Sequence, residues 1–236
     1  RVCSVRGRPG TTIVSKSGRP VIWVEVDPCA AIGAAPTEFR VGTDALAVTV
    51  RAENDFVTDV TLVVLAAIPT TARVRAAVAA DVSTGPIQRF IPGTDSGTFD
   101  YFVEEIYEED EGPILAAANL QLSEDDNVLV QGITGSPYAI GFFGYAYYQE
   151  NQDALTILNI EGVEPSATSV EDGSYALARP LFIYSDATIM QEKPQVAAYI
   201  NFFLTNVNDV IDEVGYFPAS TAALNSAKQG RAMAHN

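Results

Sequence analysis

A short strand, a turn of small residues and an amphipathic helix follow one another between residues 87 and 107. Residues 87–91 predict the strand. Between strand and helix the sequence runs Pro92-Gly93-Thr94-Asp95-Ser96-Gly97-Thr98. A strand, a glycine-bearing turn and a helix form the local unit that α/β proteins use at ligand sites. The helix is predicted from apolar side chains at helical spacing, namely Phe99, Phe102, Val103, Ile106 and Tyr107.

The residues just before this helix, Thr94, Asp95, Ser96, Gly97 and Thr98, are called the anion loop below. Ser96 or Thr98 is expected at the N-cap or in the first turn. The first backbone N–H groups of a helix have no partner within the helix, and the helix dipole is positive at that end. Because the side chains of the loop are small, an anion can approach those donors closely. The segment therefore predicts an oxyanion site.

Short strands and helices alternate along the rest of the chain, which predicts an α/β fold. The expected strands are residues 21–26, 45–50, 155–160 and 181–184, and residues 139–148 predict a strand followed by a helix. Residues 61–68 predict a helix with Thr58 or Asp59 as N-cap, and Asp125 is expected to cap another. Residues 162–173 are expected to form a polar loop. A long helix is predicted from Pro194 to a C-cap at Gly215.

Composition narrows the function classes. The 236 residues carry 30 acidic and 14 basic side chains, a formal net charge of −16. Such a surface is a poor partner for nucleic acid, whose binding depends on cations that neutralise phosphates. A small anion can still bind, because nearby N–H donors govern a site at contact distance while salt screens the net charge. No apolar run approaches the ~20 residues of a membrane span.

Cysteine and histidine are scarce. Cys3 and Cys29 either form a disulfide in an oxidising compartment or remain buried free thiols. Without a CxxC pattern, and with His235 as the single histidine, no zinc site is expected. The acidic residues between 104 and 111 are interpreted as a solvated helix face rather than a divalent-cation site.

The segment Thr94-Asp95-Ser96-Gly97-Thr98-Phe99-Asp100-Tyr101-Phe102 resembles the phosphate-site loop and helix of periplasmic phosphate-binding proteins, the receptor subunits of phosphate ABC transporters. The resemblance extends, in order and spacing, to residues 123–132, 141–148, 179–184 and 213–218. It implies a two-lobed α/β fold with its ligand in the cleft between the lobes. One lobe is expected to comprise residues 1–43 plus 179–236 and the other residues 44–178.

The same resemblance implies a non-catalytic receptor without a cofactor. It would bind inorganic phosphate on the periplasmic or extracellular side and deliver it to a membrane ABC permease. The family often carries a cysteine pair in this region, which favours the Cys3–Cys29 disulfide. Residues 1–39 match the family poorly. We therefore expect an incomplete first lobe that lacks the family's N-terminal strand, the hydroxyl-rich loop that follows it and the next helix. A lipid anchor would then lie in a segment outside this chain.

The resemblance implies some of the ligand roles. It carries over Ser96, Gly97 and Thr98 as phosphate ligands. It also places Ser17 in a segment of the first lobe that contacts the anion. Phosphate at neutral pH keeps a proton that sulfate lacks, so a selective site needs an acceptor as well as donors. Asp95 is the candidate acceptor within the loop, or else a turn residue. Family members carry an arginine where Pro92 stands; Arg19 either supplies that guanidinium or is a surface cation.

Three other functions remain open from the sequence. Asp95-Ser96-Gly97-Thr98 fits the aspartic-protease motif, but that chemistry needs a second carboxylate and no second copy occurs. A serine hydrolase using Ser96 or Ser136 would need a base, and the lone His235 is next to the C-terminal residue. The third is a receptor-fold accessory subunit of a larger assembly, with weak phosphate binding or none.

Overall fold

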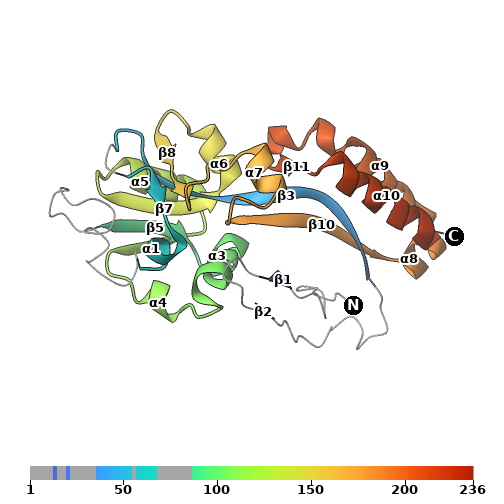
Figure 1. Ribbon diagram of the computed structural model, residues 1–236, viewed down its shortest axis with the longest axis horizontal. Coiled ribbons are helices and arrows are strands. Elements are labelled where there is room, and N and C mark those ends of the chain that lie inside the picture. The colour runs from blue at the N-terminus through green and yellow to red at the C-terminus, as the bar shows by residue number, and fades with distance from the viewer. Residues whose placement is uncertain (1–12, 15–19, 22–35, 55–56, 68–86, 236) are drawn as a thin grey trace. The chain divides into compact units, whose positions relative to one another are not determined.

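The computed structural model describes residues 13–14, 20–21, 36–54, 57–67 and 87–235 (Figure 1). The fold is mixed α/β, as the sequence predicts. The chain divides into two compact units. Unit 1 comprises Arg1–Val41, Phe182–Asn206 and Thr221–Asn236, and unit 2 comprises Gly42–Leu181 and Val207–Ser220. Cys3, Ser17, Arg19, Cys29 and most of the expected strand at 21–26 lie outside the described residues.

A seven-stranded sheet is the largest among the described residues, and its main path runs β10-β3-β7-β5-β6. Strand β5 is parallel to both of its neighbours, β6 and β7, while β3 is antiparallel to β7. Two short strands, β8 and β11, also pair antiparallel with β3. The strands of this sheet are β3 (Pro36–Arg51), β5 (Gln88–Pro92), β6 (Leu120–Ser123), β7 (Ala139–Gly144), β8 (Leu155–Ile157), β10 (Ala178–Asp186) and β11 (Phe217–Pro218). Elsewhere β1 (Ile13–Val14) pairs with β2 (Pro20–Val21), and β4 (Asp59–Val60) pairs with β9 (Asn159–Ile160).

Helices of unit 2 cover both faces of the sheet. Neighbouring residues of a strand point to opposite faces, so they belong to different core clusters. Ile91 and Phe142 belong to a core cluster with residues of α1 (Leu62–Ala67) and α3 (Gly97–Tyr107). Their neighbours Phe90 and Phe143 belong to a second cluster with α5 (Asp126–Thr134). A strand buried on both faces reads as a continuous apolar run, which explains the sequence of β3. The remaining helices of unit 2 are α4 (Gly112–Leu115), α6 (Tyr145–Glu150) and α7 (Ala167–Glu171).

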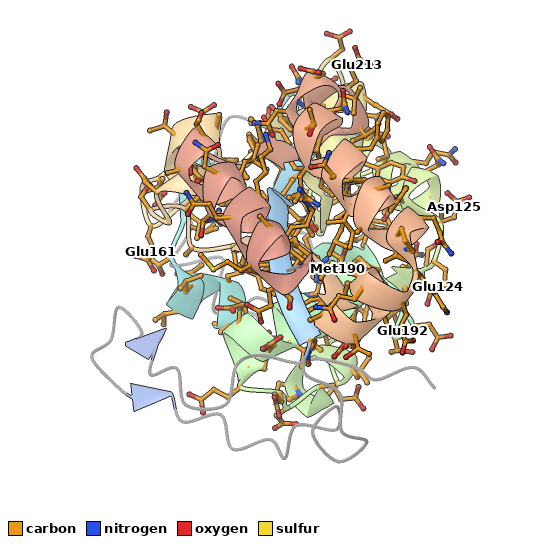
Figure 2. All side chains as sticks on the ribbon, turned by 90° about the vertical axis from the view of Figure 1, so that its right-hand side faces the viewer. Glu124, Asp125, Glu161, Met190, Glu192 and Glu213 are labelled. Carbon is orange, nitrogen blue, oxygen red and sulfur yellow. The ribbon has the colours of Figure 1, made fainter. Side chains whose placement is uncertain are left out.

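In unit 1, α8 (Ala187–Glu192), α9 (Pro194–Asn206) and α10 (Thr221–His235) pack on one another (Figure 1). Met190 of α8, labelled in Figure 2, is fully buried. On α9 the buried residues follow helical spacing, which gives that helix one core-facing stripe. These residues are Ala197, Ile200 and Leu204.

Several expected elements are confirmed, namely β5, α3, the Asp125-capped α5, and β7 followed by α6. The expected N-cap at Thr58 or Asp59 is wrong. The Thr61 hydroxyl instead accepts a hydrogen bond from the Val64 N–H at 3.1 Å. Asp59 lies in β4, where its carboxylate accepts the Gly162 N–H at 2.6 Å.

Two further expectations are corrected. The long helix predicted from Pro194 ends at Asn206, and two 3₁₀ turns follow it, Val207–Asp209 and Asp212–Val214. The predicted cap at Gly215 is confirmed, because Gly215 caps the second of these turns in the left-handed conformation. Thr205 and Asn206 donate from their side chains to carbonyls four residues earlier, a local bonding pattern that competes with helix continuation. The expected loop at 162–173 contains α7, which is stabilised by a capping box.

Candidate functional site

The anion loop connects β5 to α3 and presents its residues at the start of that helix. Thr94 and Asp95 form an exposed turn, and Ser96 is the N-cap with extended backbone angles. The Ser96 hydroxyl accepts the Thr98 N–H at 3.2 Å, and the Ser96 N–H donates to the Gly93 carbonyl at 3.0 Å. The N-cap predicted at this position is therefore confirmed for Ser96, and Thr98 lies within the first turn.

The helix behind the loop is well anchored. Phe99, Phe102 and Val103 are all at least nine-tenths buried in the unit 2 core. The first turn itself stays accessible, with Gly97 exposed and Thr98 half-buried. An eleven-residue helix fixed along one side thus presents a small-residue first turn to solvent. Such a turn is chemically suited to an anion, because its backbone donors and dipole favour negative charge.

An acidic side chain supports the loop from the neighbouring strand end. The Gly93 N–H donates to the Ser123 carbonyl at 2.9 Å, and the Asp95 N–H donates to Glu124 Oε1 at 3.3 Å. Glu124 directly precedes Asp125, the N-cap of α5, and both residues are labelled in Figure 2. A Cβ atom on Gly93 would lie 1.8 Å from Glu124 Oε1, so a larger residue at this position would displace the Glu124 side chain.

A partly buried ion pair contacts the first turn of α3. Arg179 of β10 donates from Nη2 and Nε to Asp44 Oδ2, at 3.0 and 3.2 Å. Its remaining terminal nitrogen, Nη1, donates to the Gly97 carbonyl at 2.9 Å. The guanidinium carbon also lies 5.0 Å from the centre of the Tyr101 ring. Arg179 thus joins the strands β3 and β10 to the anion loop.

Burial governs the electrostatics of this cluster. Asp44 is only 9% exposed, and this burial raises the pKa of its carboxyl, while the Arg179 charge acts in the opposite direction. Burial also raises the pKa of Tyr101 strongly, with a further contribution from Glu105. Tyr101 therefore remains a neutral phenol against the Arg179 guanidinium at physiological pH.

The structure brings together the five residues of the anion loop but provides no placement for Ser17, Arg19, Cys3 or Cys29. Sequence reasoning missed Arg179 and Asp44 as a functional pair. A partial signal was present, because Asp44 directly precedes the apolar run 45–50 and Arg179 lies near the start of a mainly apolar strand, and charges in such positions are rarely buried unless they are paired.

The geometry of the described residues bears on the protease, hydrolase and metal-site alternatives. The Asp95-Ser96-Gly97-Thr98 segment begins a helix, with Ser96 acting as its cap. The Ser136 hydroxyl accepts the Tyr138 N–H at 3.4 Å. Within the described ranges, no three histidine, cysteine, aspartate or glutamate side chains cluster in a way that could hold a metal ion. In that same part of the chain, no helix is both long and apolar enough to cross a membrane.

Comparison with known proteins gives a consistent result. The model of the PBP superfamily domain matches residues 19–207. Protein SphX of Synechococcus elongatus is 37% identical over 232 residues, covering 93% of this chain and 67% of that protein. The phosphate-binding protein PstS of Staphylococcus saprophyticus is 30% identical over 216 residues, which covers 88% of this chain and 65% of that protein. This chain thus spans about two thirds of the length of these relatives.

A solved structure agrees with the sequence matches. A possible phosphate binding protein from Planctomyces limnophilus superposes with a TM-score of 0.72 at 31% identity. The superposition covers 95% of this chain and 79% of that one.

Proposed function

This chain belongs to the phosphate-binding family of the PBP superfamily, and on that premise we propose that it is an extracytoplasmic receptor for inorganic phosphate. It captures phosphate at the anion loop and delivers it to a membrane ABC permease, without catalysis and without a cofactor. The observation that carries the proposal is the accessible, Ser96-capped first turn of α3, whose small residues leave backbone donors within reach of an anion.

Donors for the bare phosphate oxygens come from the hydroxyls of Ser96 and Thr98 and from the N–H groups of Gly97 and Thr98. The Thr98 N–H is held by Ser96 Oγ at 3.2 Å, a long contact for which a phosphate oxygen can compete. Thr94 completes the loop from the exposed turn. Charge-assisted hydrogen bonds to an oxyanion are stronger than neutral ones, which favours this exchange of partners.

Asp95 is proposed as the acceptor for the phosphate proton. Its side chain is exposed in the turn directly before the cap, so it can reach an anion seated on the first turn. A carboxylate accepts the P–O–H hydrogen but repels an anion that has no proton. Asp95 would therefore favour phosphate over sulfate.

Capture between two lobes is part of the same proposal. The chain passes between its two compact units at Val41/Gly42, Leu181/Phe182, Asn206/Val207 and Ser220/Thr221, and the first two passages lie near the proposed hinge crossings at residues 42–46 and 178–181. Ser17 and Arg19 remain proposed ligands from the first lobe. We further propose residence on the periplasmic or extracellular face, with a Cys3–Cys29 disulfide and an anchor supplied by a segment outside this chain.

Alanine substitutions at the two hydroxyl side chains test the site. Ser96→Ala and Thr98→Ala should each weaken phosphate binding roughly tenfold, because each removes a donor to the anion. Ser166→Ala is the matched control, since Ser166 is also an N-cap serine of unit 2 but caps α7. Ser166→Ala should lose about as much helix stability as Ser96→Ala but keep the phosphate affinity of the parent protein. Equal affinity in all three variants would place the anion elsewhere.

The alternative role, an accessory subunit of a larger assembly, makes the opposite prediction. The purified chain would then bind neither phosphate nor sulfate and would co-purify with a large complex.

A further inference from the structure

We propose that Arg179 is a positioning residue for the anion loop, which orients and polarises the Thr98 N–H through the peptide group that this N–H shares with Gly97. Asp44 holds Arg179 in place for that task. The inference rests on the proposed function in so far as the anion is phosphate.

The first step is the peptide geometry. The Gly97 carbonyl and the Thr98 N–H belong to one planar peptide group. Arg179 Nη1 donates to that carbonyl at 2.9 Å, on the side of the peptide opposite the N–H. Gly97 is the first residue of α3, so the bond from Arg179 adds a side-chain restraint to a peptide plane that the helix and its cap already hold. The direction of the Thr98 N–H is thereby set.

The second step is polarisation. A hydrogen bond from a cation to a carbonyl oxygen draws electron density through the amide, which makes the N–H of the same group a better donor. Chains of hydrogen bonds strengthen one another in this way. The Thr98 N–H is one of the proposed phosphate donors, so the charge of Arg179 acts on the anion through the backbone.

The third step is the rigidity of Arg179 itself. Two of its nitrogens bind the same Asp44 oxygen, the third binds Gly97, and the ring of Tyr101 lies beside the guanidinium. A planar guanidinium can make these contacts together, whereas a lysine ammonium on a flexible stem cannot. Asp44 is nearly fully buried, so it requires this cation, and the pair has one defined arrangement.

The fourth step is the charge around the loop. Asp95 and Asp100 lie in the loop and first turn, and Glu124 accepts a hydrogen bond from the loop backbone. These acids oppose an incoming anion. Arg179, a cation bonded to the loop, offsets these negative charges. The loop itself has no arginine, because Pro92 stands where family members carry one.

The test uses Arg179→Lys and Arg179→Gln, with Arg51→Gln as the matched control. Arg51 pairs with Glu53 in the same unit, and its side chain is 31% exposed against 34% for Arg179. Two quantities are measured: the amide hydrogen-exchange rate of Thr98 without phosphate, and the phosphate dissociation constant by calorimetry. Both Arg179 variants should exchange faster at Thr98 and bind phosphate roughly tenfold to a hundredfold more weakly, with the control unchanged.

The lysine variant separates positioning from simple charge attraction. It keeps the cation beside Asp44, so it should fold even if Arg179→Gln does not. If Arg179→Lys retains the parent's Thr98 exchange and affinity, the inference is wrong, because charge alone suffices. If the parent chain binds no phosphate, the proposed function fails, and Thr98 exchange in Arg179→Lys still decides whether Arg179 positions the loop.

Discussion

The ring of Phe102 in α3 lies nearly flat on the ring of Phe142 in β7, with centroids 3.9 Å apart and planes inclined by 12°. Both side chains are at least nine-tenths buried. This contact fastens the helix that begins at the anion loop to the sheet of unit 2. The stacked pair therefore supports the site from within the core.

Phe102→Ala should destabilise the protein by about 3–5 kcal/mol, since it removes a buried aromatic ring and leaves a cavity. Phe202→Ala is the control, because Phe202 is 65% exposed on α9 and should cost about 0.5 kcal/mol or less. Urea unfolding followed by circular dichroism measures both. A Phe102→Ala loss as small as the control's would contradict the packing described.

Glycines 93 and 141 are expected to differ in their tolerance of alanine. A Cβ on Gly93 meets the end of the Glu124 side chain, which can move, so Gly93→Ala should cost about 1 kcal/mol. A Cβ on Gly141 lies 2.2 Å from the Phe90 carbonyl oxygen, which is backbone and cannot move easily, so Gly141→Ala should cost at least about 3 kcal/mol. Unfolding free energies test the contrast, and the reverse order would refute it.

Stability should fall in alkali, and Tyr175 should account for part of the fall. Its ring is 1% exposed, its hydroxyl donates to the Leu46 carbonyl at 2.8 Å, and burial raises its pKa. Above about pH 10 the unfolded chain loses the tyrosine proton while the folded chain keeps it. The free energy of unfolding from this group therefore decreases by about 1.4 kcal/mol per pH unit there.

The substitution Tyr175→Phe should flatten that alkaline slope, although it also costs about 1 kcal/mol at neutral pH for the lost hydrogen bond. Urea midpoints between pH 8 and 11 give the slope. Tyr199→Phe, at a tyrosine 59% exposed, is the control. If stability falls as steeply with pH in Tyr175→Phe as in the parent protein, Tyr175 is not a source of the alkaline loss of stability.

Asp95→Asn should reduce selectivity more than it reduces phosphate affinity. The amide oxygen still accepts the phosphate proton, but the charge that repels sulfate is gone. We expect sulfate affinity to rise by roughly tenfold relative to phosphate. Competition titrations with both anions measure the ratio. An unchanged ratio would assign proton recognition to another residue.

The sequence predicts well those features whose causes are local. The β5–loop–α3 unit follows from helical spacing of apolar residues and a serine cap, all within residues 87–107. The helix α7 was hidden because its capping box uses Ser169 at the third position instead of glutamate or glutamine. The early end of α9 depends on side chains that bond back to their own helix, which apolar periodicity does not reveal.

The Asp44–Arg179 pair lay beyond sequence reasoning for a different reason. Its partners are 135 positions apart, and they meet because β3 and β10 are neighbours in the sheet. Each of the two charges adjoins apolar strand residues, but only the sheet order shows that they meet each other and that the pair reaches the anion loop. The proposed first-lobe ligands Ser17 and Arg19 remain predictions.

Calorimetric titration of the purified chain with phosphate, with sulfate as control, tests the central claim most directly. A phosphate receptor of this kind should bind one phosphate saturably, with an affinity well above its affinity for sulfate. No heat of binding from phosphate, or equal affinity for the two anions, would contradict it.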